Sequence, residues 1–204
     1  MTAAPELKTS AAEYLELERS APEKHEFLDG FVYAMAGASF NHDRIAKNLS
    51  RRLAEALSDL PCENFTSDVR VAADADAAYF YPDASALCGP TAAANGTNDT
   101  LLNPSFIAEI LSESTEAFDR GDKFIRYQQI ATLADYLLIS QWDVSAELFQ
   151  RQPDGKWLLT RFTDPDSSVP LTSLGCQIRL GDLYAKVVFE EKARQLPDRR
   201  EEKR

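Results

Sequence analysis

The sequence predicts an α/β or α+β fold, with one mixed central β-sheet flanked by helices. Segments with helical periodicity and strand-like segments follow one another in the order helix, hairpin, long helix, several strands, helix and further strands. Such an order is typical of a sheet covered by helices. The chain has 204 residues, 44 % of them hydrophobic, which suffices for one core. We expect a single domain over residues 1–189 and a charged, disordered tail over 190–204.

The first third of the chain predicts a helix, a hairpin and a long helix. Residues 9–19 begin with threonine and serine and contain good helix formers, and Pro22 follows them. Asp29-Gly30 separates two apolar stretches, which is the strongest short-range hairpin signal. From Asn41 onward, apolar residues recur at spacings of four, four, four and three before Pro61 ends the helix: Ile45, Leu49, Leu53, Leu57 and Leu60.

The rest of the chain predicts strands around one further helix. Residues 65–72, 78–88 and 104–112 have strand character, and a small, polar loop separates the last two. A second helix is expected over 119–130, with Asp119 as its N-cap. Residues 135–141, 146–151 and 156–162 follow as strands, and a short strand and a helical turn close the domain.

Charge and composition limit the possible functions. The formal net charge is -11, whereas proteins that hold nucleic acid by its phosphates are usually basic on the binding side. A nucleic-acid partner therefore requires locally concentrated basic residues or a bound divalent cation. No apolar run reaches the roughly 18 residues that cross a bilayer, and no secretion signal opens the chain, so we expect a soluble, cytoplasmic protein. Three distant cysteines suggest neither a disulfide framework nor a zinc site.

Two carboxylates occur inside strand patterns and are therefore candidates for chemistry. Glu109 lies in the apolar run Phe106–Leu111, and Asp83 directly follows Pro82, which marks a sheet edge or a bulge. If the two strands are neighbours, both carboxylates could enter one cleft and would repel each other without a cation. Oxygen ligands of this kind suit Mg²⁺ or Mn²⁺. The alternative is that each pairs with a buried arginine or caps a turn.

Lys123 is the third candidate. It shares one helix face with Tyr127 and Ile130, and this apolar face should look toward the sheet. An ammonium group there could orient an attacking water or stabilise charge on a phosphate in the transition state. The alternative is a solvated lysine on a helix edge, which the spacing alone favours.

Several motifs together resemble one known family. They are "HEFLDG", Asn41-His42 at a helix start, "YPDASALC", "PSFIAEILSESTEAFDRGDKFIRY", "ADYLLIS" and a closing "SLG". In this order they look like the Uma-two family of restriction endonuclease-like proteins, over about residues 9–189. That family is placed in the PD-(D/E)XK nuclease superfamily. The resemblance implies a mixed sheet flanked by helices and a site that binds Mg²⁺ through an aspartate and a glutamate.

The resemblance also implies roles for individual residues. Asp83 matches the aspartate of the "PD" element, and Glu109 matches the acidic residue of the next strand. Leu111 stands where the superfamily pattern has lysine, so the resemblance implies that Lys123 takes over its role. Glu26 resembles an additional metal ligand, and its alternative is an exposed hairpin charge. His42 is expected to cap a helix or lie at the surface, and His25 at the surface.

The function that these residues favour is Mg²⁺-dependent endonucleolytic hydrolysis of DNA, possible also with Mn²⁺. The best candidates for phosphate contacts lie on the long helix: Arg44, Lys47, Arg51 and Arg52. Their alternative is a solvated face paired with Glu55 and Asp59. Two other functions stay open: an inactive nuclease-fold module for binding or assembly, and a metal-dependent hydrolase of small phosphate esters. From the resemblance we also expect a homodimer.

Overall fold

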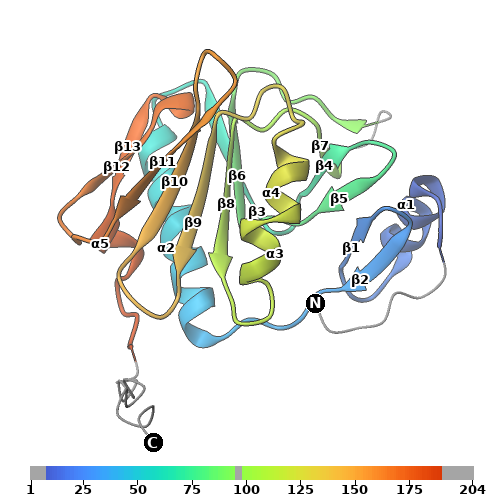
Figure 1. Ribbon diagram of the computed structural model, residues 1–204, viewed down its shortest axis with the longest axis horizontal. Coiled ribbons are helices and arrows are strands. Elements are labelled where there is room, and N and C mark those ends of the chain that lie inside the picture. Colours follow the sequence, from blue (N-terminus) through green and yellow to red (C-terminus); the bar gives the residue numbers. More distant parts are fainter. Residues whose placement is uncertain (1–7, 95–97, 190–204) are drawn as a thin grey trace, which may run out of the picture.

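The fold is α+β, with mixed sheets flanked by helices, as the sequence predicts (Figure 1). The computed structural model describes residues 8–94 and 98–189. The predicted tail over 190–204 lies outside the described residues. None of the helices within the described ranges has the length and apolar character needed to cross a membrane.

The N-terminal elements confirm the predicted helix and hairpin. Helix α1 (Ala11–Ser20) begins at a capping box in which Ser10 and Glu13 each bond the other's backbone N–H. Strands β1 (His25–Leu28) and β2 (Phe31–Ala34) pair across Asp29 and Gly30. Both turn residues have positive φ, 52° and 91°, which is the conformation that a tight two-residue hairpin requires.

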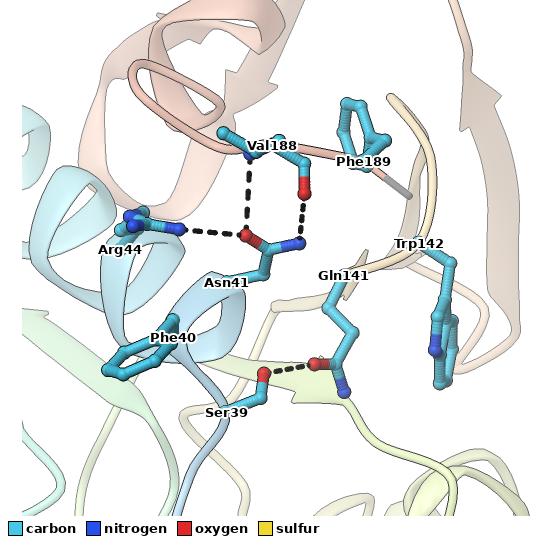
Figure 2. A pocket seen from close by; sticks show the side chains of 8 residues that line it. All are labelled: Ser39, Phe40, Asn41, Arg44, Gln141, Trp142, Val188 and Phe189. Carbon is cyan, nitrogen blue, oxygen red and sulfur yellow. Dashed lines mark hydrogen bonds between the residues drawn. The ribbon is translucent and has the colours of Figure 1, made fainter. Parts of the chain in front are cut away.

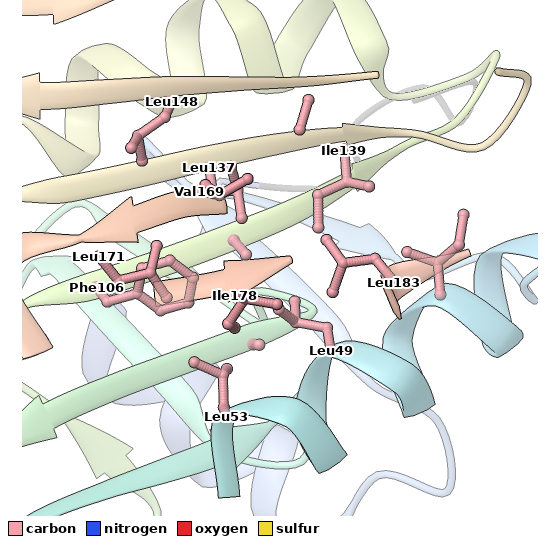
Figure 3. Close-up of a cluster of buried hydrophobic side chains, with 14 of the residues drawn as sticks. Leu49, Leu53, Phe106, Leu137, Ile139, Leu148, Val169, Leu171, Ile178 and Leu183 are labelled. Carbon is pink, nitrogen blue, oxygen red and sulfur yellow. The ribbon is translucent and has the colours of Figure 1, made fainter. Parts of the chain in front are cut away.

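Helix α2 (Phe40–Leu57) carries the predicted apolar stripe into the core. Ile45, Leu49 and Leu53 are fully buried, and they pack against residues of one sheet face such as Phe106 and Ile139 (Figure 3). Leu60 does not belong to this stripe, because the helix ends at Leu57 and Leu60 is 38 % exposed.

Two segments predicted as continuous strands are each divided in two. Residues 65–72 fall into β3 (Cys62–Thr66) and β4 (Arg70–Asp74), separated by a turn. Residues 78–88 fall into β5 (Ala78–Phe80) and β6 (Ala84–Cys88), separated at Pro82, which has no N–H to donate to a ladder. As a result the strands form not one central sheet but a six-stranded sheet, a five-stranded sheet and a two-stranded sheet.

The second predicted helix is also divided. It consists of α3 (Glu116–Arg120) and α4 (Asp122–Tyr127), which meet at Gly121. Asp119 is therefore not an N-cap but a buried residue inside α3. The remaining elements are β7 (Thr100–Leu101), β8 (Phe106–Leu111), β9 (Asp135–Ser140), β10 (Ala146–Arg151), β11 (Trp157–Phe162), β12 (Ser168–Leu171), the 3₁₀ turn η2 (Thr172–Leu174), β13 (Cys176–Arg179) and α5 (Leu180–Leu183). The six-stranded sheet has the order β11-β10-β9-β8-β6-β3, the five-stranded sheet has the order β2-β1-β5-β4-β7, and β12 pairs with β13.

Strand β8 is the centre of the six-stranded sheet. It pairs antiparallel with β6 and parallel with β9, and all six of its residues are buried. Helix α2 covers one face of this sheet, while α3 and α4 cover the other (Figure 1). The second face shares its core with the five-stranded sheet, through residues such as Val71 and Phe80. Both faces of the Glu109 strand are therefore covered, as its apolar pattern predicts.

The spacing of the cysteines suggests no disulfide, and this expectation is wrong for one pair of cysteines. Cys62 and Cys88 form a disulfide, whereas Cys176 is a free thiol. The two bonded residues are 26 positions apart in the chain but are direct partners in the β3–β6 register. The pairing of these strands brings the thiols together, and cysteine spacing gives no sign of it.

Candidate active site

The predicted site residues line one cavity of about 520 Å³. It lies where the end of β8 meets the β5–β6 junction, strand β1 and the helices α3 and α4. The four residues proposed from the sequence as catalytic or metal-binding all contribute to its lining, namely Glu26, Asp83, Glu109 and Lys123. The four basic residues proposed for phosphate contacts, Arg44, Lys47, Arg51 and Arg52, do not. Two further residues, His42 and Asp119, also line it.

Lys123 points into the protein and not to solvent. Its side chain is 6 % exposed, and its Nζ lies 2.9 Å from Glu109 Oε1 and 3.0 Å from Glu26 Oε1. Asp119 Oδ1 is 3.5 Å away. Burial lowers the pKa of Lys123, but the carboxylates of Glu109 and Glu26 raise it more, and the pKa lies well above its ordinary value. The ammonium group is therefore charged in the folded protein.

Glu109 is buried in the centre of β8, and its carboxylate contacts one cationic and one neutral side chain. Besides Lys123, the hydroxyl of Tyr127 donates a 3.0 Å hydrogen bond to Glu109 Oε1. Burial raises the pKa of this carboxyl well above its ordinary value, Lys123 opposes the shift, and the negative charges of Asp119, Asp83 and Glu26 add to it. A single lysine thus does not balance the carboxylates around Glu109.

Asp83 lies beside β8, the strand that carries Glu109. Its Oδ2 accepts a 2.7 Å hydrogen bond from the backbone N–H of Ile110, on β8. The break at Pro82 ends β5 and directs the next residue toward β8 instead of continuing the ladder. The same oxygen lies 3.3 Å from His42 Nε2.

His42 and Asp119 are the two site residues that sequence reasoning missed. The backbone N–H of His42 is capped by Ser39, but its imidazole lies against Asp83 with a side-chain exposure of 17 %. Burial lowers the pKa of His42, and the hydrogen bond and charge of Asp83 outweigh this and raise it. Helix spacing could have indicated both residues, because residues three or four positions apart lie on the same face of a helix. His42 stands three residues before Ile45 of the buried stripe, and Asp119 stands four residues before Lys123.

Glu26 is not an exposed hairpin charge. It is 8 % exposed, and its Oε1 accepts a 3.2 Å hydrogen bond from the backbone N–H of Tyr81. Together with the contact to Lys123, this bond joins the five-stranded sheet to the helix that carries the lysine. Glu26 therefore helps to place both Lys123 and the chain that leads to Asp83.

His25 is likewise not a simple surface residue. Its Nδ1 lies 3.0 Å from Glu18 Oε2, and the imidazole is 27 % exposed. Glu18 also accepts a 3.0 Å hydrogen bond from the hydroxyl of Tyr81. His25 therefore belongs to a polar cluster that holds α1 against the segment before Asp83.

The charges in the cavity suit a divalent cation only in part. Five carboxylates line it, those of Glu26, Asp83, Glu109, Glu113 and Asp119, together with one lysine and one histidine. Within the described residues, however, no group of three or more His, Cys, Asp or Glu side chains is arranged to hold a metal ion. The ammonium of Lys123 lies in contact with both Glu26 and Glu109 and occupies the space that a shared ion would need.

The basic residues of α2 are largely occupied by neighbouring carboxylates. Lys47 pairs with Asp43 at 2.7 Å, and Arg51 and Arg52 pair with Glu55 at 3.0 and 2.8 Å. Arg44 differs, because it donates a 3.2 Å hydrogen bond to the amide oxygen of Asn41 and has no carboxylate partner in the part of the chain that the structure describes. The alternative interpretation, a helix face on which basic residues pair with carboxylates, thus holds for Arg51 and Arg52 through Glu55.

A family model and two curated relatives match most of the chain. The model is described as "Uma2: Putative restriction endonuclease" and matches residues 11–181. The uncharacterized protein sll1609 of Synechocystis is 39 % identical over 160 residues, which cover 78 % of this chain and 90 % of the relative. The uncharacterized protein slr1290 of the same organism is 36 % identical over 186 residues, covering 91 % and 96 %.

A solved structure has the same fold. It is described as a "putative nuclease belonging to DUF820" from Anabaena variabilis, and it matches with a TM-score of 0.69. The match covers 88 % of this chain and 99 % of the other. The sequence identity is 15 %, so this likeness concerns the fold alone.

We predict that Lys123→Met lowers the free energy of unfolding by about 3–5 kcal/mol, because it leaves Glu109 and Glu26 buried without their cation. Urea unfolding near neutral pH measures the loss. The double variant Lys123→Met/Glu109→Gln should recover part of it, since the second change removes the unpaired charge. Lys156→Met is the control, because that lysine is 82 % exposed and should matter little. A Lys123→Met variant as stable as wild type would contradict the pairing.

A second prediction concerns pH. The pKa of Glu109 is higher in the folded protein than in the unfolded chain, so the folded state binds the proton more tightly between the two values. Stability should therefore decrease as pH rises above about 4.3, the unfolded value, until the folded pKa is passed. Glu109→Gln should flatten this part of the stability curve, measured by urea unfolding across that range. Glu16→Gln, at an exposed position, should leave the curve unchanged.

Proposed function

Because the chain belongs to the Uma2 family, whose description is "Putative restriction endonuclease", we propose that it is a divalent-metal-dependent nuclease that hydrolyses phosphodiester bonds in DNA. The observation that carries this proposal is the convergence of Asp83, Glu109 and Lys123 on one cavity. Two carboxylates can hold a divalent ion, and a buried ammonium can stabilise the negative charge that develops on a phosphate diester during hydrolysis. They come from three separate elements, the β5–β6 junction, β8 and α4.

Asp83 and Glu109 are the proposed ligands of Mg²⁺ or Mn²⁺. Within the described residues, their hydrogen bonds and ion pairs go to Asp83 Oδ2 and Glu109 Oε1, which leaves Oδ1 and Oε2 for an ion. Mg²⁺ is commonly held by one or two carboxylates, with water and substrate phosphate completing its shell. A cluster of three protein ligands is therefore not required. When bound, such an ion polarises the phosphate and lowers the pKa of a water molecule.

Lys123 is the proposed positioning and charge-stabilising group. Its ammonium contacts Glu109 and could hold the attacking water beside the metal ligands or stabilise negative charge on the phosphate. The resemblance implies Glu26 as an additional ligand. The 3.0 Å contact between Glu26 and Lys123 instead supports a role in orienting the lysine, which Asp119 shares.

A metal-dependent hydrolase of small phosphate esters is the second candidate. The ion pairing of Lys47, Arg51 and Arg52 favours it, because these residues then offer few free charges to a DNA backbone. An inactive binding module is disfavoured, since a buried glutamate and lysine that serve no chemistry would be costly to keep. A cytoplasmic homodimer stays a prediction.

We predict that the purified protein nicks supercoiled plasmid or cuts single-stranded DNA when Mg²⁺ or Mn²⁺ is added. Glu109→Ala and Lys123→Ala should each lower the rate at least about 100-fold, because each removes a group that acts on developing charge. Gel assays with time courses measure the rates. Lys156→Ala, at an exposed turn, should cut like wild type.

Two results of this assay would decide against parts of the proposal. Metal-dependent nicking that survives both substitutions would show that the site lies elsewhere. Hydrolysis of bis-(p-nitrophenyl) phosphate without any DNA cleavage would favour the small-ester candidate.

We also predict that Mn²⁺ raises the melting temperature, because an ion bound only by the folded state stabilises it. At an ion concentration of 100 times the Kd the gain is about 2.7 kcal/mol. Asp83→Asn should abolish most of the shift, whereas Glu16→Gln should keep it, since Glu16 is exposed on α1. Differential scanning fluorimetry gives the readout, and an unchanged wild-type melting temperature at high Mn²⁺ would exclude the metal site.

A further inference from the structure

A second hollow adjoins the carboxylate cavity. It has a volume of about 450 Å³ and shares three lining residues with the cavity: Ser39, Gln141 and Trp142. Its other side is formed by the first turn of α2 and by the chain around Val188 (Figure 2). The two hollows therefore lie side by side.

The hollow presents an aromatic ring and a cation to solvent. Phe40 is 84 % exposed, although a phenylalanine ring gains most from burial. The guanidinium of Arg44, one turn later on α2, lies 5.8 Å from the centre of this ring. Figure 2 shows Phe40 and Arg44 on one side of the hollow and Trp142 on the opposite side.

Hydrogen bonds fix the polar residues that line the hollow between Phe40 and Trp142. Asn41 donates a 2.8 Å hydrogen bond to the carbonyl of Val188, and its amide oxygen accepts the bond from Arg44 (Figure 2). The hydroxyl of Ser39 donates to Gln141 Oε1 at 2.5 Å. Gln141 in turn donates a 2.8 Å bond to the carbonyl of Leu111, two residues after Glu109 on β8. Gln141, which lines the hollow, is thus hydrogen-bonded to β8, the strand that carries the candidate metal ligand Glu109.

We propose that this hollow binds an unpaired nucleotide next to the phosphate that is cleaved, with its base stacked on Phe40 and its phosphate held by Arg44. This inference rests on the proposed nuclease function and specifies its substrate as single-stranded or locally unpaired DNA. Every base has a flat face that stacks on an aromatic ring, and arginine adds charge and cation–π attraction. Bases inside a duplex are stacked on each other, and they reach Phe40 only after unpairing.

The arrangement accounts for how an acidic protein could bind DNA. Of the basic residues Arg44, Lys47, Arg51 and Arg52, Arg44 is the one that lines the hollow, and it lacks a carboxylate partner within the described residues. The other three are ion-paired along α2. Recognition through one stacked base and one phosphate needs little positive surface, whereas tracking a duplex by its phosphates needs much more.

The test measures binding separately from cleavage. A fluorescein-labelled oligothymidylate is titrated with protein in Ca²⁺, and a gel confirms that the strand stays intact. Phe40→Ala should weaken binding about 5- to 100-fold, the loss typical of one stacked base, and Phe40→Trp should restore it. Arg44→Gln should reduce the slope of log affinity against log salt by about one. Leu158→Ala removes a side chain that is 54 % exposed on β11 and serves as the matched control.

Duplex DNA of the same length provides the comparison. Phe40→Ala should leave duplex binding unchanged, because the base is not available for stacking. An equal loss for both forms, or none for either, would overturn the proposed base site. So would a change in sedimentation of the Phe40→Ala variant without any effect on DNA, since the ring would then cover a second copy of the chain.

Cleavage assays separate this inference from the proposed function. If wild type binds the single strand through Phe40 but hydrolyses no DNA with Mg²⁺ or Mn²⁺, the base site stands and the nuclease activity falls. If wild type cleaves DNA and Phe40→Ala cleaves single strands with unchanged KM and kcat, the nuclease stands and the base site is wrong.

Discussion

The buried ammonium of Lys123 is the contact on which the arrangement of the site depends. It bonds Glu109 on β8 and Glu26 on β1 and approaches Asp119 on α3, so one side chain connects the six-stranded sheet, the five-stranded sheet and the covering helices. Three buried carboxylates in such a small volume would repel each other and lose hydration without it. The lysine therefore has a structural task in the free protein, and the proposed chemistry uses a group that is already held in place.

The cavity that this lysine lines lies where the chain passes from the five-stranded sheet to the six-stranded sheet. At Pro82 the chain leaves β5 in one sheet and enters β6 in the other, and Asp83 stands at the change. Backbone groups on both sides fix this junction: the N–H of Tyr81 donates to Glu26, and the N–H of Ile110 donates to Asp83. A continuous strand would have kept Asp83 in a regular ladder. The interruption instead turns its carboxylate toward β8, beside Glu109.

The net charge of this protein does not show which ligands it can bind, because positive and negative side chains are unevenly distributed over it. The -11 formal charge includes carboxylates that line the cavity and others on α2 that pair with Lys47, Arg51 and Arg52. Beside the cavity, Arg44 and the exposed ring of Phe40 offer a different surface. A ligand that combines phosphate with a flat apolar group matches both regions at once. The proposed nucleotide site rests on this combination of groups.

The sequence by itself determined the local elements: the capped first helix, the Asp29-Gly30 hairpin, the buried stripe of α2 and the covered strand around Glu109. It left open whether Lys123 points inward, and the structure shows that it does. Periodicity and turn chemistry suffice for the local elements, because they report which side of a segment is buried. They do not report what it is buried against. Only the tertiary structure decided the two sheets, the Cys62–Cys88 bond, the entry of His42 and Asp119 into the site, and the contact of Glu26 with Lys123. Each of these depends on strand register and packing between residues far apart in the chain, which no local pattern encodes.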